Sequence, residues 1–208
     1  MQIALAALLA YLLGSVSFAI VVSRLMRLPD PRSYGSKNPG ATNVLRTGKK
    51  VAAILTLAGD AGKGWLAVWL AQVLTGDALA VALAGLAAFL GHLYPVFYRF
   101  QGGKGVATAA GALLGYNVWL GAGALVSWIV IAAFFRFASL ASIVAALFAA
   151  FYAFWLFGLQ PLTGAVLVMG ALLVWRHREN IKRLAAGTES KLGQSRPTPP
   201  PDPSAAGR

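Results

Sequence analysis

The stretch VWLGAGALVSWIVIAAFF, residues 118–135, decides the fold class because it carries no charged residue. A helix needs roughly 17–25 mostly apolar residues to cross about 30 Å of hydrocarbon. Similar apolar segments recur along the chain, at 3–23, 51–74, 78–98, 105–117, 118–135, 140–157 and 161–175. The sequence therefore predicts an all-α integral membrane protein, a polytopic bundle of about seven transmembrane helices.

The composition supports one membrane-embedded domain over residues 1–193. Of the 208 residues 58% are hydrophobic and 12% are charged, about half the charged fraction of a soluble domain. The first twenty residues lack the basic start and the Ala-x-Ala site of a signal peptide, so we interpret them as the first span. Residues 194–208 are rich in proline and predict a disordered tail.

The basic residues predict the orientation of the chain in the membrane. Lys and Arg cluster in the connections 24–50, 99–104 and 176–191, with Arg136 between them. The alternate connections carry none; they are 75–77, 116–117 and 158–160. Because basic loops stay in the cytoplasm, we expect the N-terminus outside and the C-terminus inside. The net charge of +12 then reports topology and anionic partners, and we expect no nucleic-acid partner.

The short segment 105–117 predicts an anion site. Its thirteen residues span about 20 Å, roughly 10 Å less than the hydrocarbon. Its N-terminal end is therefore recessed, and there lie Gly102, Gly103, Lys104 and Gly105. Glycines let backbone N–H groups approach a ligand, a helix start attracts anions, and Lys104 adds a full charge. We expect phosphate binding here, although the same residues could form a plain turn.

The connection 35–46 is dense in short polar side chains: Ser36, Asn38, Thr42, Asn43 and Arg46. Arg46 can grip a phosphate with two hydrogen bonds. Alone, the run is ambiguous between a capped turn and a polar pocket. Further along, Ser139 could be a helix N-cap, and Ser142, three residues on, would share its helix face.

Three polar residues interrupt apolar spans. Asp60 and Lys63 are three residues apart, so they share a helix face and can pair. Charges at this depth normally face the bundle interior and have a function, but a pair that only fixes the packing is the alternative. We interpret His92 as a packing histidine.

The last basic cluster contains His177 and Asn180, which are one helical turn apart and can reach one ligand. An ordinary basic flank would explain the neighbouring arginines but not these two residues. The chain has no cysteine, no G-x-S-x-G motif and no carboxylate cluster, so we expect no metal and no cofactor. These absences favour chemistry on an already activated donor whose leaving group is phosphate.

The motifs together resemble the bacterial PlsY-type acyl-phosphate:glycerol-3-phosphate acyltransferases. The resemblance runs from about residue 11 to 193. It rests on Gly35-Ser36-x-Asn38-Pro39-Gly40-Ala41-Thr42-Asn43-x-x-Arg46, Asp60-x-x-Lys63-Gly64, Gly91-His92-x-x-Pro95, Gly102-Gly103-Lys104-Gly105-Val106-Ala107-Thr108 and Arg176-His177-x-x-Asn180-Ile181 with Glu189 and Lys191. The departures are small: Lys37 stands where glycine is frequent, Gln101 where a basic residue is common, and Ala138 where serine is frequent, which favours Ser142.

The resemblance implies acyl transfer from acyl-phosphate to the 1-hydroxyl of sn-glycerol 3-phosphate, giving lysophosphatidic acid and phosphate. It implies that acyl-CoA and acyl carrier protein are not donors, and that a separate acyl-phosphate synthase is a partner. The location would be the bacterial inner membrane, with the active site facing the cytoplasm.

The resemblance also implies residue roles. The implied catalytic residues are His177, Asn180, Lys104 and Ser142. The implied phosphate-binding residues are Ser36, Asn38, Thr42, Asn43, Arg46, Gly102, Gly103, Lys104 and Gly105. Supporting roles fall to Asp60, Lys63, His92 and Glu189.

Two other functions compete with this one. A transporter or flippase for a phosphorylated metabolite needs polar groups on a path to both faces and usually an internal repeat. Here the polar clusters gather on one side, and no repeat is found. A non-catalytic scaffold is the second rival, and it would assign no special role to Lys104 or Arg46.

Overall fold

The structure is a computed structural model that describes residues 1–194, so most of the predicted tail (195–208) lies outside the described residues. Within the described part, all regular structure is helical, which confirms the predicted all-α class. The α-helices are α1 (Gln2–Gly14), α2 (Phe18–Leu25), α3 (Ala41–Val44), α4 (Lys50–Thr75), α5 (Ala78–Leu93), α6 (Val106–Tyr116), α7 (Val118–Phe135), α8 (Ala138–Phe157), α9 (Pro161–Arg176) and α10 (Arg178–Ala185). Short 3-10 turns are η1 (Leu45–Thr47) and η2 (Val96–Tyr98).

Five segments are long and apolar enough to cross a membrane. They are α1 with α2 (Gln2–Leu25), α4, α5 with its extension to Tyr98, α7 and α8. The shorter apolar helices α6 and α9 supply two more, which gives the seven segments that the sequence predicts. The predicted short segment is α6, whose 11 residues span only about 17 Å.

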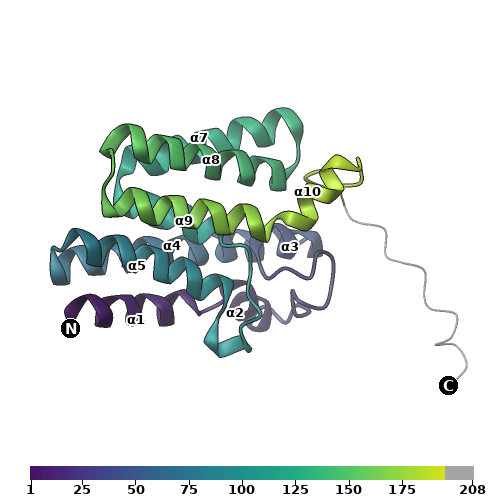
Figure 1. The fold of residues 1–208 in the computed structure, drawn as a ribbon. Helices are drawn as coiled ribbons and strands as arrows, with labels where there is room; N and C mark the ends of the chain where they lie inside the picture. Colours follow the sequence, from purple (N-terminus) through teal and green to yellow (C-terminus); the bar gives the residue numbers. More distant parts are fainter. Residues whose placement is uncertain (195–208) are drawn as a thin grey trace, which may run out of the picture.

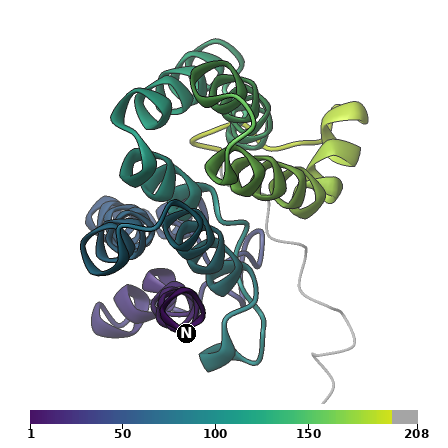
Figure 2. The same ribbon diagram turned by 60° about the vertical axis from the view of Figure 1, so that its left-hand side comes forward.

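The long helices lie side by side, with α1 at one edge, α4 and α5 next to it, then α9, and the α7–α8 pair at the opposite edge (Figure 1). The view along the bundle in Figure 2 shows the same order. The small elements α2, α3 and α10 all lie at one end of the bundle, and the N-terminus lies at the other (Figure 1). The polar segments that the positive-inside rule groups together therefore share one end.

Glycines set the close approach of α4 and α6. A Cβ at Gly111 would lie 1.8 Å from the carbonyl oxygen of Ala61, and one at Gly64 would lie 2.2 Å from that of Thr108. Association of helices in lipid depends on van der Waals packing, and small residues let the backbones meet. This contact fixes α6 against α4 and so positions the loop that precedes α6.

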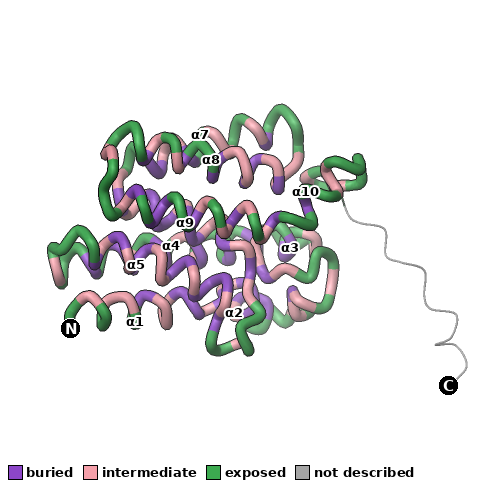
Figure 3. The backbone as a smooth tube through the Cα atoms, in the orientation of Figure 1, coloured by how far each residue is buried: buried purple, intermediate pink, exposed green. Residues whose placement is uncertain are grey.

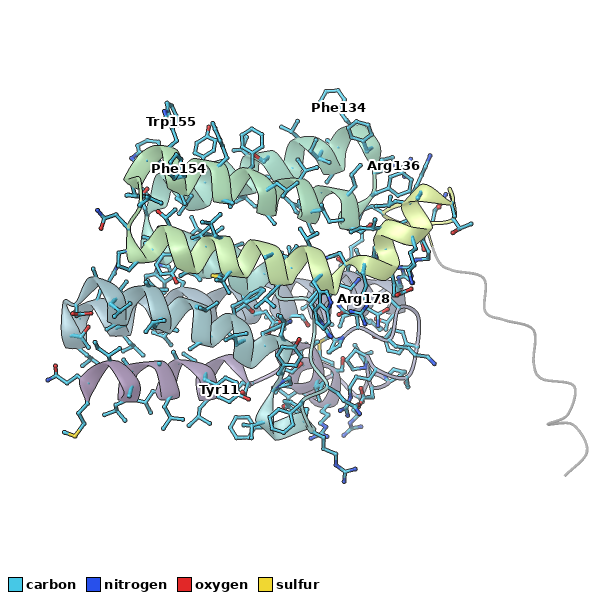
Figure 4. All side chains as sticks on the ribbon, viewed as in Figure 1. Tyr11, Phe134, Arg136, Phe154, Trp155 and Arg178 are labelled. Carbon is cyan, nitrogen blue, oxygen red and sulfur yellow. The ribbon has the colours of Figure 1, made fainter. Side chains whose placement is uncertain are left out.

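Much of the α7–α8 pair is exposed (Figure 3), and its large exposed side chains are apolar. Phe134 is 81% exposed and Trp155 is 69% exposed, and both point away from the bundle (Figure 4). Large exposed apolar side chains are expected on helices that contact lipid tails, where no water is present to penalise them.

The first span is not continuous, unlike the single segment 3–23 that the sequence predicts. α1 ends at Gly14 and α2 begins at Phe18, with Ser17 in an extended conformation at φ −88° and ψ 103°. A broken helix inside a membrane protein leaves backbone groups that need new partners. Here the partners come from α4: Lys63 Nζ donates to the carbonyl oxygen of Val16 (2.6 Å), and Asp60 Oδ1 accepts from the Phe18 N–H (3.4 Å).

Candidate active site

A buried polar centre lies beside the break in the first span. Lys63 Nζ is 2.8 Å from Asp60 Oδ1 and 3.0 Å from His92 Nδ1. Asp60 is 2%, Lys63 3% and His92 6% exposed. The predicted pairing of Asp60 with Lys63 is therefore confirmed, and His92 joins the pair from α5.

The glycine loop before α6 lies directly against the end of α5. The Gly103 N–H donates to the carbonyl oxygen of His92 at 3.1 Å. A Cβ at Gly103 would lie 2.2 Å from His92 Nε2 and 3.0 Å from the carbonyl oxygen of Pro39. Gly103 thus contributes close approach rather than its N–H, and the connection 35–46 meets the glycine loop here through Pro39.

Arg176, at the end of α9, holds the carbonyl side of this loop. Its Nη2 donates to the carbonyl oxygens of Gly102 (3.1 Å) and Gly103 (3.0 Å), and its guanidinium lies 5.8 Å from the centre of the Tyr94 ring. In a planar trans peptide the N–H points opposite to the C=O. Since the Gly103 carbonyl faces Arg176, the N–H of Lys104 faces away from that guanidinium.

Lys104 is connected to α10 by a chain of hydrogen bonds. Its Nζ donates to Asn180 Oδ1, and Asn180 Nδ2 donates to Glu189 Oε1 at 2.6 Å. Glu189 also accepts from Ser139 Oγ (2.8 Å) and from Arg183 Nε (2.6 Å). The network holds the Lys104 ammonium in one place at the head of α6.

Glu189 remains ionised in this network. Burial raises the pKa of its carboxyl, but hydrogen bonds from Asn180, Ser139 and Arg183 outweigh burial and hold the pKa below its usual value. An ionised Glu189 accepts only, so it orients the Asn180 amide with its nitrogen toward Glu189 and its oxygen toward Lys104.

His177 caps the junction of α9 and α10 and is 3% exposed. Its Nδ1 is 2.8 Å from the carbonyl oxygen of Leu173, so Nδ1 carries the proton and Nε2 carries the lone pair. Burial, followed by the charge of Lys104, lowers the pKa of the imidazole to about 4. His177 is therefore neutral at physiological pH.

The connection 35–46 is organised by Asn43. Its Oδ1 accepts from the Ser36 N–H (3.0 Å), and its Nδ2 donates to the carbonyl oxygens of Pro31 (2.7 Å) and Tyr34 (3.2 Å). Asn43 is 1% exposed, so its side chain shapes the loop from within. Arg46 lies over the same turn, with Nη1 3.4 Å from the position of a Cβ on Gly35.

The polar groups of this end suit a phosphate-bearing ligand, and the comparisons with known proteins give a family named for such a substrate. The family model described as glycerol-3-phosphate acyltransferase matches residues 4–187. The chain belongs to this family. Among its relatives, the glycerol-3-phosphate acyltransferase of Ralstonia nicotianae is 62% identical over 194 residues, covering 91% of this chain and 94% of that protein. That of Burkholderia pseudomallei is 62% identical over 201 residues, covering 95% and 99%.

Solved structures of the integral membrane acyltransferase PlsY (YgiH) share the fold. Its glycerol 3-phosphate form has a TM-score of 0.88 at 38% identity, covering 93% of this chain and 96% of that one. Its lysophosphatidic acid form has a TM-score of 0.86. The resemblance to the PlsY family is thus confirmed, and the protein is an integral membrane acyltransferase of phospholipid biosynthesis.

The structure gathers most of the predicted site residues of this acyltransferase at one end of the bundle. Two residues, Ser139 and Ser142, stand differently from the sequence interpretation. Ser139 is not the N-cap of α8, because Phe137 holds that position, and the Ser139 hydroxyl binds Glu189 instead. Ser142 lies between α7 and α8, where it accepts from Trp128 Nε1 (3.1 Å) and donates to the Ala138 carbonyl (2.7 Å). Among the described residues no hydrogen bond joins Ser142 to the Lys104 network.

Two arginines beside the candidate site were given no individual role by the sequence analysis. Arg176 looked like part of a basic flank, which explains an arginine at a membrane boundary without any specific role. Arg183, whose Nε donates to Glu189 Oε2 at 2.6 Å, was likewise explained as part of the basic flank. The spacing of Arg176 directly before His177 was the only signal, and it becomes meaningful once the glycine loop is placed beside α9.

Proposed function

We propose that this acyltransferase moves a fatty acyl group from acyl-phosphate to the 1-hydroxyl of glycerol 3-phosphate, releasing lysophosphatidic acid and phosphate. The observation that carries the proposal is the fixed Lys104 ammonium, held by Asn180 beside the glycine loop. A preorganised cation at a helix start is suited to a phosphate leaving group, because it costs no reorganisation when the charge develops.

The reaction needs no covalent enzyme intermediate. The substrate hydroxyl oxygen forms a bond to the acyl carbonyl carbon, and the bond from that carbon to the phosphate oxygen breaks. The phosphate leaves with the electron pair, stabilised by Lys104 and by N–H groups of the loop. Bringing the two substrates together in one geometry supplies much of the rate increase.

The proton of the hydroxyl has two candidate acceptors. His177 presents the lone pair of Nε2, but its pKa of about 4 makes it a weak base at neutral pH. A phosphate oxygen, with a second pKa of about 6, is the better match. We propose that His177 accepts a hydrogen bond from the hydroxyl and orients it, while a substrate phosphate takes the proton.

The two proposed substrates are glycerol 3-phosphate as acceptor and acyl-phosphate as donor. The PlsY structures in the glycerol 3-phosphate and lysophosphatidic acid forms support glycerol 3-phosphate as acceptor here. We propose that the donor is acyl-phosphate from a separate synthase, not acyl-CoA or acyl carrier protein. The basic connections favour an inner-membrane location with the N-terminus outside and the site facing the cytoplasm.

An assay with purified protein in detergent tests the proposal. We expect phosphate release from acyl-phosphate only when glycerol 3-phosphate is present, with formation of lysophosphatidic acid and no product from acyl-CoA or acyl carrier protein donors. Efficient use of acyl-CoA would overturn the donor assignment. Uptake of labelled glycerol 3-phosphate into proteoliposomes without conversion would favour the transporter, and neither activity would favour the scaffold.

A further inference from the structure

His92 lies between the buried ion pair and the glycine loop, and it touches both. Its Nδ1 is 3.0 Å from Lys63 Nζ. Its Nε2 occupies the space where Gly103 would carry a Cβ, 2.2 Å from that position. One ring therefore bridges the interior of the bundle and the loop at which we place a phosphate.

Lys63 determines which ring nitrogen of His92 carries the proton. An ammonium has three N–H donors and no lone pair. Lys63 directs these donors at the Val16 carbonyl (2.6 Å), Asp60 Oδ1 (2.8 Å) and His92 Nδ1 (3.0 Å). A protonated Nδ1 would set two N–H groups against each other, while Asp60 Oδ1 at 3.5 Å is too distant for a good compensating bond. Nδ1 is therefore the acceptor, and Nε2 carries the proton.

The resulting Nε2–H group is a donor aimed at the glycine loop. Among residues 1–194 no hydrogen bond to Nε2 is found, although His92 is only 6% exposed. Nε2 is not among the fully enclosed side-chain atoms that lack a partner, so this donor is within reach of a ligand at the loop. Lys104 follows Gly103 directly, and a ligand at this loop would meet its positive charge as well. An acceptor-rich anion, a phosphate, fits both groups.

We propose that His92 is a phosphate-binding residue of this enzyme, and that Lys63 holds it in the tautomer that donates from Nε2. The proposal rests on the proposed function only in taking a substrate phosphate as the ligand. Asp60 and Lys63 then do more than fix the packing of α4, because they set the hydrogen-bonding polarity of a ligand-contacting ring. This assignment replaces the interpretation of His92 as a packing histidine.

Two substitutions separate this role from a purely structural one. His92→Asn keeps an acceptor near the Nδ1 position for Lys63 but loses the donor at the loop. His92→Gln reaches the loop with an N–H but leaves Lys63 without its acceptor. We expect His92→Asn to raise KM for the phosphate substrates about 10- to 100-fold with little loss of Tm. We expect His92→Gln to recover KM to within about tenfold of the wild type despite a lower Tm.

The opposite order would overturn the proposal: wild-type KM in His92→Asn with a defect in His92→Gln identifies a structural role. Wild-type KM in both variants would overturn it as well. A loss of stability cannot produce this pattern, because the variant expected to have the larger rise in KM, His92→Asn, is the one expected to keep its Tm.

Nitrogen-15 NMR of histidine-labelled protein tests the tautomer in the unmodified enzyme. The chain has two histidines, so a His177→Asn variant identifies the His92 signals. We expect a protonated Nε2 on His92, a protonated Nδ1 on His177, and a shift of the His92 Nε2 signal on titration with glycerol 3-phosphate or inorganic phosphate. A protonated Nδ1 on His92, or no shift at saturating levels of either ligand, would refute the proposal. If only the acyl-phosphate assay fails, the proposed function is refuted, but the NMR titration still tests whether His92 binds phosphate.

Discussion

Removing the charge of Lys104 should cost more activity than removing any exposed charge of the same end. In Lys104→Met the ammonium is lost and the apolar chain remains. Two charges 4 Å apart interact by about 4 kcal/mol at an effective dielectric constant of 20. Lys104 is half-buried, so screening by solvent reduces this to about 2–3 kcal/mol. We therefore expect kcat/KM to fall about 30- to 150-fold.

The assay is release of phosphate from acyl-phosphate in detergent, with thermal unfolding to verify that the variant is folded. Lys182→Ala is the matched control, because it removes one positive charge from the neighbouring helix α10. Lys182 is 73% exposed in its side chain and is 3.2 Å from Glu179, and an exposed pair contributes little. We expect its kcat/KM to stay within about twofold of the wild type. Equal losses in both variants would show that diffuse charge, rather than a fixed ammonium, drives the reaction.

Three further predictions follow from burial and close contact. Because burial lowers the pKa of His177 to about 4 against about 6.5 in an unfolded chain, kcat/KM should show no imidazole step between about pH 5.5 and 8. A step in kcat/KM near pH 6.5 that disappears in His177→Asn would contradict this. The unfolded chain takes up the His177 proton at a higher pH than the folded chain, so the free energy of unfolding should fall as pH falls from about 6.5 to 4. Gly111→Ala forces a Cβ to 1.8 Å from the Ala61 carbonyl and should lower Tm by about 3–10 °C, whereas Gly62→Ala, with nothing within 4 Å, should leave Tm unchanged or higher; equal effects would refute the packing argument. Glu189→Gln removes the ionised acceptor of Asn180 and should lower kcat/KM about tenfold, and a variant with wild-type kinetics would show that the Asn180 amide needs no such support.

Much of the fold was predictable from the sequence, because the bilayer imposes strict requirements on composition. A segment such as 118–135, with no charge over its whole length, has few alternatives to a membrane-spanning helix. Likewise, the short segment before Asn117 predicted a short helix with a recessed glycine loop, and α6 is that helix. These features are local, so a single segment of sequence specifies each of them.

The break between α1 and α2 could not be predicted in the same way. The residues around Ser17 are apolar enough to continue the span. The break is stable because Lys63 and Asp60, more than forty positions away, satisfy the Val16 carbonyl and the Phe18 N–H. Only packing brings these partners together.

The site divides along the same line. The residue types were readable from the sequence, since glycines before a helix and a lysine among them predict anion binding wherever they occur. The partners were not readable, because a hydrogen bond between Lys104 and Asn180, or between Arg176 and Gly102 (3.1 Å), joins positions more than seventy residues apart. Sequence spacing determines neighbours on one helix. The meeting of different helices depends on the shapes of their packed surfaces, which only the tertiary structure provides.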